Sequence, residues 1–120
     1  MAYHNDFGRE AERKASHYLL EIGYEIMERN WRFGKAEIDI IAKDNAEIVM
    51  VEVKARNYTR IIDPKDAVNL QKRKLLIKAA NEYVQTNNLD FEVRFDIISL
   101  LKKEHIWMIE HTKHAFTILL

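Results

Sequence analysis

The chain has 120 residues and a mass of 14.3 kDa, which is enough for one domain with its own core and too little for two. Apolar residues make up 48% of the chain and charged residues 32%, which excludes a disordered protein, and the absence of cysteine excludes disulfide scaffolds, thiolate zinc sites and cysteine nucleophiles. The formal net charge is zero, so any anion-binding face has to arise from an uneven distribution of charge.

Helical and strand patterns follow one another along the chain. A helix is predicted from Asn5 or Asp6 to about Ile22, ended by Gly23. After three strand patterns, Asp63-Pro64 indicates a helix entry or loop before a second helix, from about Val68 to Gln85. The predicted strands cover residues 25–31, 37–42, 48–54, 91–101 and 105–110. The order α-β-β-β-α-β-β predicts a single α/β domain over residues 1–120, with helices packed on one sheet.

The strands predicted at 37–42 and 48–54 form a hairpin if the turn is centred between Asn45 and Ala46. Side chains alternate between the two faces of a strand, so the apolar faces of both strands must coincide. This register predicts four opposed pairs: Ile40 with Val51, Ile38 with Val53, Asp39 with Glu52 and Glu37 with Lys54.

The opposed acids Asp39 and Glu52 are the most informative of these pairs. Directly opposed residues have Cβ atoms about 4.5–5.5 Å apart, so two carboxylates there repel each other. A divalent cation removes this repulsion, and oxygen ligands suit Mg²⁺ or Mn²⁺. Lys54, on the same face, is placed to orient a water or to stabilise charge on a phosphate. The alternative is a solvent-facing polar strand in which Glu37 and Lys54 form an ordinary cross-strand pair.

Each predicted helix directs one charged side chain toward the sheet. At 100° per residue, Glu12 falls within the apolar stripe of the first helix, where it needs a partner: a metal-bound water, a lysine or an arginine. A structural salt bridge is an equal alternative for Glu12. Lys72 continues the apolar stripe of the second helix, so we expect it to point toward the sheet.

Basic residues are concentrated between Lys54 and Lys78, a segment with a net charge of +6, while the rest of the chain carries −6. This asymmetry indicates an anion-binding face, with a solvated helix face as the alternative. The predicted phosphate contacts are Lys72 itself, Arg73, Lys74 and Lys78 on the second helix, and Arg56 and Arg60 after the acidic strand.

Other side chains show no catalytic pattern. No serine has a histidine and acid partner pattern, and no phosphate-binding glycine loop exists, so serine hydrolases, P-loop proteins and dinucleotide-binding proteins are not indicated. Asp96 has two interpretations: it supports the acidic site, or it simply pairs with Arg94. No apolar run is long enough to span a membrane and no export signal precedes the first helix, so we expect a cytoplasmic protein without a membrane partner.

A series of short motifs runs through residues 4–116 in a fixed order. It consists of Gly8 with Glu12, Tyr18-Leu19, Gly23-Tyr24, Arg29-Asn30-Trp31-Arg32, Glu37-Ile38-Asp39-Ile40-Ile41-Ala42, Val51-Glu52-Val53-Lys54-Ala55-Arg56, Ala67-Val68 with Lys72, Arg94-Phe95-Asp96 and Ala115-Phe116. The series resembles the YraN-like family of small bacterial proteins. That family belongs to the restriction-endonuclease-like, or PD-(D/E)xK, superfamily and is related to archaeal Holliday junction resolvases.

The resemblance implies a restriction-endonuclease-like fold, a mixed β-sheet flanked by α-helices. It implies a metal-dependent endonuclease that hydrolyses phosphodiester bonds in DNA, branched or processed structures included. The implied ligands of Mg²⁺ (or Mn²⁺) are Asp39, Glu52 and the Val53 carbonyl. The implied catalytic residues are Glu12, Asp39, Glu52, Lys54 and Lys72.

The expected partner is therefore a nucleic acid, with DNA as the first choice. Superfamily nucleases that cut both strands frequently dimerise, so a homodimer is a second expected partner that the resemblance allows. Two alternatives remain open. The chain is a nucleic-acid-binding module that keeps the nuclease fold with little or no catalysis, or it is an interaction protein with no nucleic-acid role.

Overall fold

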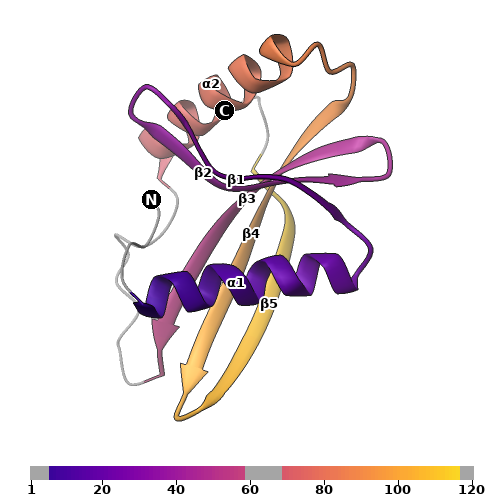
Figure 1. The fold of residues 1–120 in the computed structure, drawn as a ribbon. Coiled ribbons are helices and arrows are strands. Elements are labelled where there is room, and N and C mark those ends of the chain that lie inside the picture. Colours follow the sequence, from indigo (N-terminus) through magenta and orange to yellow (C-terminus); the bar gives the residue numbers. More distant parts are fainter. Residues whose placement is uncertain (1–5, 59–68, 117–120) are drawn as a thin grey trace.

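The computed structural model describes residues 6–58 and 69–116. The elements, in chain order, are α1 (Asp6–Glu21), β1 (Glu25–Phe33), β2 (Ala36–Asp44), β3 (Glu47–Asn57), α2 (Leu70–Thr86), β4 (Glu92–Lys103) and β5 (Ile106–Phe116) (Figure 1). This confirms the predicted order α-β-β-β-α-β-β. The expected helix starts at Asn5 and Val68, and the loop at Asp63-Pro64, lie outside the described residues. Within those residues, neither helix has the length and apolar character of a membrane span.

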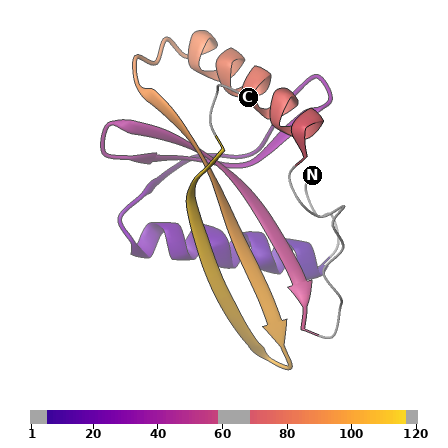
Figure 2. The same ribbon diagram turned by 180° about the vertical axis from the view of Figure 1, so that it is seen from behind.

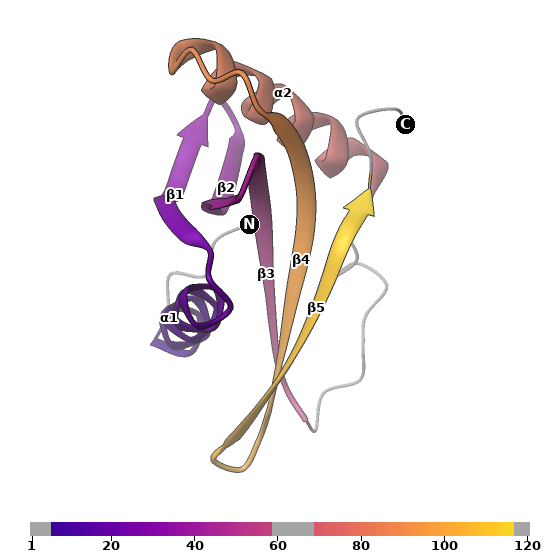
Figure 3. The ribbon, with the colours of Figure 1, turned by 90° about the vertical axis from the view of Figure 1, so that its right-hand side faces the viewer.

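The five strands form one mixed sheet in the order β1-β2-β3-β4-β5. β3 and β4 are parallel, and the other neighbouring pairs are antiparallel. A parallel pair needs a long crossover connection, and α2 lies within the one between β3 and β4. The two helices lie on opposite faces of the sheet (Figure 3).

Each helix covers its own hydrophobic cluster. The small side chains of Ala11 and Ala15, with Leu19, pack α1 against a cluster that includes Val51 and Val53 of β3. A second cluster lies under α2 and combines Leu76, Ala79, Ala80 and Tyr83 with Ile38, Ile41, Ile48, Met50 and Phe95 of the sheet. β3 is therefore apolar on both faces over most of its length, and Glu52 stands out as an acid buried in this strand, 3% exposed.

The hairpin of β2 and β3 has the predicted register near its turn. Asp44 lies opposite Glu47, and Ile40 lies opposite Val51, as predicted. Asn45 supports the tight turn because it adopts a left-handed conformation, φ 55°, that asparagine tolerates. Ile40 and Val51 form the last pair of this ladder. Beyond them β2 continues beside β1 while β3 continues beside β4, and we call this point of separation the fork (Figure 1).

The predicted pairing is wrong beyond the fork. Ile38 packs in the cluster under α2 and Ile40 in the cluster under α1, so the two side chains do not share a face. Glu37 lies opposite Arg32 of β1, with 3.4 Å between its carboxylate and the guanidinium, and does not pair with Lys54. The physical reason is that a two-stranded ribbon twists more strongly than a wide sheet. Asn30 of β1, at φ 51°, adds a local turn of the chain in this ribbon.

Candidate active site

Asp39 lies at the fork, where its side chain completes the main-chain hydrogen bonding of the neighbouring strand, β3. The Val53 N–H donates to Asp39 Oδ2 at 2.8 Å. In a continuous ladder this N–H would reach a main-chain carbonyl of β2, so the carboxylate takes the place of a backbone acceptor. Asp39 is 1% exposed, and among the described residues none donates a hydrogen bond to its other oxygen, Oδ1. A buried carboxylate oxygen without a hydrogen bond is unusual.

The electrostatic surroundings of Asp39 make its charge costly. Burial raises the pKa of Asp39 well above its ordinary value, and the neighbouring carboxylates of Glu52 and Glu12 raise it further. The two acids that were predicted to face each other across the hairpin thus interact across the fork, although they are not a pair of the ladder. Glu12 reaches the same carboxylate from α1, as the position of Glu12 in the apolar stripe predicts.

Lys72 of α2 places a positive charge next to Glu52. Its Nζ lies 2.9 Å from Glu52 Oε1, which confirms that this lysine points toward the sheet. The start of the helix holds it in place, because the Asn69 side chain accepts a hydrogen bond from the Lys72 N–H at 2.8 Å. Burial acts to lower the pKa of Lys72, but the Glu52 and Asp39 carboxylates keep it above the ordinary lysine value.

Lys54 joins the same group from β3. It follows Glu52 on the same face of the strand, because side chains alternate along β3. Burial lowers the pKa of Lys54, and the neighbouring Lys72 ammonium lowers it further, against the opposing effects of Glu52 and Asp39. Glu12, Asp39, Glu52, Lys54 and Lys72 therefore meet at the fork. Arg56 lies on β3 beyond Lys54, along the same face.

A pocket between α1 and β1 opens onto Asp39 from the other side. Glu12, Ser16, Asn30 and Ile40 contribute to its wall together with Arg9, Arg13 and Arg29. Arg29 is oriented by α1, since its Nε donates to Ser16 Oγ at 3.3 Å. These arginines are not among the predicted phosphate contacts, because the net charge of the chain is most positive within one segment, residues 54–78. The motif Arg29-Asn30-Trp31-Arg32 and the neighbour Arg13 of Glu12 were the available signals.

Several predicted phosphate contacts lie away from the fork. Lys74 and Lys78 border a separate groove beside α2, whose wall includes Ile77, Val84 and Val93. The Arg73 guanidinium lies over the Phe116 ring, 5.4 Å from its centroid. Arg60 lies outside the described residues. Among the basic residues predicted on α2, Lys72 contacts a residue of the fork through its ion pair with Glu52.

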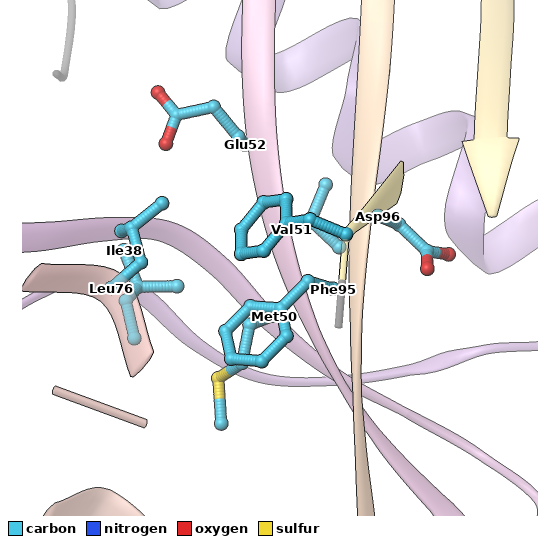
Figure 4. Close-up of a pocket in the computed structure, with 8 residues that line it drawn as sticks. Ile38, Met50, Val51, Glu52, Leu76, Phe95 and Asp96 are labelled. Atoms are coloured by element: carbon cyan, nitrogen blue, oxygen red, sulfur yellow. The ribbon is translucent and has the colours of Figure 1, made fainter. Parts of the chain in front are cut away.

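Asp96 belongs to a different polar network. Arg94 donates to both of its oxygens, at 2.9 and 3.0 Å, and His111 Nε2 lies 2.7 Å from Asp96 Oδ2. Figure 4 shows the Asp96 carboxylate pointing away from that of Glu52, with the Val51 side chain between them. Of the two interpretations of Asp96, the structure supports the one in which it pairs with Arg94.

The group at the fork fits a hard divalent cation. The described residues contain no cluster of three or more histidine, aspartate or glutamate side chains arranged as metal ligands. Asp39 and Glu52 offer two carboxylates, and Mg²⁺ in proteins is commonly held by one or two carboxylates, with water and a substrate phosphate as the other ligands. The Oδ1 atom of Asp39 is buried and receives no hydrogen bond from the described residues. A cation bound to this oxygen would remove the free-energy cost of burying the charged carboxylate.

Comparison with known proteins identifies relatives along nearly the whole chain. A Flavobacterium psychrophilum protein, described as a UPF0102 protein, is 48% identical over 116 residues that cover 97% of this chain and 98% of that protein. A UPF0102 protein of Phocaeicola vulgatus is 43% identical, over 97% of this chain and 96% of the relative. One of Porphyromonas gingivalis is 41% identical, over 100% and 90%.

Among solved structures, the chain is similar to Hjc of Archaeoglobus fulgidus, described as a Holliday junction resolvase from an archaeal hyperthermophile. The identity is 16% and the TM-score 0.42, over 86% of this chain and 75% of Hjc. The profile of Uncharacterised protein family UPF0102 matches residues 11–100, from within α1 to the last third of β4. The chain therefore belongs to Uncharacterised protein family UPF0102, the YraN-like family that the motif series predicts.

Proposed function

We propose that the protein is a metal-dependent endonuclease that hydrolyses phosphodiester bonds in DNA, with branched or processed structures as its substrates. One observation carries this proposal: a buried aspartate, Asp39, whose pKa is raised by burial and by Glu52 and whose Oδ1 receives no hydrogen bond from the described residues. A buried carboxylate next to a second carboxylate destabilises the folded chain. Such an arrangement is expected at an active site, where the same carboxylates are needed for chemistry.

In this proposal Asp39, Glu52 and the Val53 carbonyl hold Mg²⁺ or Mn²⁺. When bound, the ion neutralises charge on the phosphate and makes water a better nucleophile. Asp39 contributes from β2 and Glu52 from β3, so both strands of the fork are needed. Lys54 lies next to Glu52 on the same face, where its ammonium contacts the attacking water or the phosphate oxygens and stabilises the developing negative charge.

The remaining residues position the substrate. Lys72 holds the Glu52 carboxylate at 2.9 Å and presents a positive charge at the mouth of the site. Glu12 keeps a further carboxylate beside Asp39, where it orients water. Arg13 and Arg29 line the pocket on the α1 side of Asp39, while Lys72 lies on the α2 side. Positive charge on both sides of the scissile phosphate suits a continuous strand of nucleic acid.

The test is cleavage of a panel of duplex, single-stranded and four-way-junction DNAs with Mg²⁺ or Mn²⁺. We expect cleavage that EDTA abolishes and that Asp39→Ala reduces to background. Asp90→Ala, an exposed aspartate in the connection between α2 and β4, is the matched control and should cleave like the wild type. Cleavage that survives Asp39→Ala would show that the fork is not the active site.

A nucleic-acid-binding module without catalysis is the second candidate. It is favoured by the contact between Lys72 and Glu52, since a lysine already compensates one carboxylate without a metal. This function predicts salt-dependent DNA binding that Glu52→Ala leaves unchanged, and no cleavage of any substrate in the panel with either metal.

A further inference from the structure

The sheet face that carries Glu52 continues to the far end of β3. α1 packs on the opposite face, where Val53 and Ala55 belong to its cluster, and α2 packs over β1, β2 and the first halves of β3 and β4, where Met50 and Phe95 belong to its cluster. In the described part of the chain no helix covers the far half of β3, β4 and β5 on this side. Figure 2 shows this half of the three strands in front of α1 and below α2.

A row of basic side chains leads along this face to an exposed aromatic ring. Lys54 and Arg56 follow Glu52 at every second position of β3. Tyr58 comes next and extends the ladder, since its N–H donates to the Lys102 carbonyl at 2.8 Å. Lys103 of β4 lies over the Tyr58 ring, with its Nζ 4.5 Å from the centroid. We call Lys54, Arg56, Tyr58 and Lys103 the β3 track.

Tyr58 is 55% exposed although one side of its ring is in contact with Lys103. An exposed aromatic ring at the end of a basic row is the combination that proteins use to bind single-stranded nucleic acid, with cations on the phosphates and rings against the bases. Bases in a duplex are stacked on each other and have no free face for Tyr58. The chemistry of the track therefore favours an unpaired strand.

We infer that the β3 track binds a single-stranded segment of nucleic acid, with its phosphates on Lys54 and Arg56 and a base stacked on Tyr58. The inference rests on the proposed function for the position of the cleavage site beside Glu52. Along β3, Tyr58 is about 20 Å from Glu52 at about 3.3 Å per residue. A stacked strand advances about 3.4 Å along its axis per nucleotide, so it covers this distance in about six nucleotides, and a more extended strand needs fewer. The substrate class is a nucleic acid with an unpaired region within about six nucleotides of the scissile phosphate.

The experiment measures binding in EDTA, so that no cleavage occurs. Fluorescently labelled oligothymidylates of about 3 and about 12 nucleotides, and a blunt duplex of about 12 base pairs, are titrated with protein at low salt. The wild type should prefer the 12-nucleotide strand. Because stacking of one base on an aromatic ring changes affinity by about tenfold, Tyr58→Ala should weaken binding of that strand about tenfold and leave binding of the duplex unchanged. Tyr58→Trp should restore the preference.

Phe91→Ala is the matched control. Phe91 is also an exposed ring, 37% exposed, with the Nζ of Lys43 at 4.8 Å from its centroid, but it lies before β4, at the opposite end of the sheet from Tyr58. The Phe91→Ala variant should bind all three probes like the wild type. The inference is overturned if Tyr58→Ala binds the 12-nucleotide strand as the wild type does, or if Phe91→Ala loses as much affinity as Tyr58→Ala.

The two proposals fail in different ways. Cleavage that depends on Asp39, together with no effect of Tyr58→Ala on strand binding, would overturn the β3 track alone. A preference for single strands that depends on Tyr58, together with no cleavage under any metal, would support the track and overturn the proposed endonuclease.

Discussion

Replacing Asp39 with asparagine should stabilise the metal-free protein at neutral pH. The asparagine oxygen can still accept the Val53 N–H, now 2.8 Å from Asp39 Oδ2, so the backbone contact at the fork is kept. The amide removes a buried negative charge beside Glu52 and offers that carboxylate a donor. A buried polar group left unsatisfied costs roughly 1–3 kcal/mol, so we expect a gain of about 2 kcal/mol. For a chain of this length that corresponds to a rise of about 8 °C in Tm.

The pH dependence gives the sign of the effect independently. The pKa of Asp39 is raised in the folded chain, so the folded state holds its proton more tightly than the unfolded state does. Ionised Asp39 therefore destabilises the fold above the raised pKa, and this penalty disappears as the pH falls to about 4, where the unfolded carboxyl is protonated as well. The advantage of Asp39→Asn over the wild type should shrink to nothing over the same interval.

Asp96→Asn is the matched comparison, because Asp96 is also 1% exposed. Its two oxygens are bound by Arg94, so this change leaves a buried guanidinium with weaker partners and should cost about 3 kcal/mol. Thermal unfolding in EDTA between pH 4 and pH 8, followed by circular dichroism, measures both variants. A lower Tm for Asp39→Asn than for the wild type at pH 8, or a gain that persists unchanged at pH 4, would refute the reasoning.

Three further outcomes test the other residues of the site. Lys72→Met should lower the metal-free stability by about 3 kcal/mol, because it removes an ion-pair partner from the buried Glu52 carboxylate, which is 3% exposed. Mn²⁺ should then raise the Tm more than in the wild type, and an equal rise would show that Lys72 does not compete with the cation. Lys54→Ala should keep Mn²⁺ binding in calorimetry while cleavage falls at least about 100-fold, whereas loss of both would make Lys54 a structural residue. The double variant Arg13→Ala/Arg29→Ala should reduce the slope of log affinity against log salt by about 0.9 per lost phosphate contact in fluorescence anisotropy, and an unchanged slope would remove these arginines from the interface.

The sequence was sufficient where local rules decide the structure. The turn at Asn45 and the alternation of apolar residues determine which side chains meet near the hairpin, and Ile40 lies opposite Val51 for that reason. Helical periodicity likewise placed Lys72 toward the sheet, where it contacts Glu52. Both predictions depend on a single element or on one tight connection, within which few arrangements compete.

The errors come from interactions that no local pattern encodes. The period of two along β2 predicts a shared face for Ile38 and Ile40, but β2 changes its partner strand between them and twists. Arg29 comes close to Asp39 only because β1 packs beside α1, so a search along one segment cannot find it. The distance between segments in the sequence, and not a lack of chemical signal, limited the prediction of the site.

The fork also places the two carboxylates of the site on strands that diverge from each other. Asp39 is carried by β2, beside β1, and Glu52 by β3, beside β4, while each of the two hydrophobic clusters contains residues of both β2 and β3. The separation of the two carboxylates therefore depends on how β2 and β3 diverge at the fork, where the Val53 N–H donates a hydrogen bond to Asp39. A substitution away from the fork that changes how α2 packs on the sheet, such as Ala79→Val, would therefore change the separation of the two carboxylates, and with it the metal affinity that the proposed function requires.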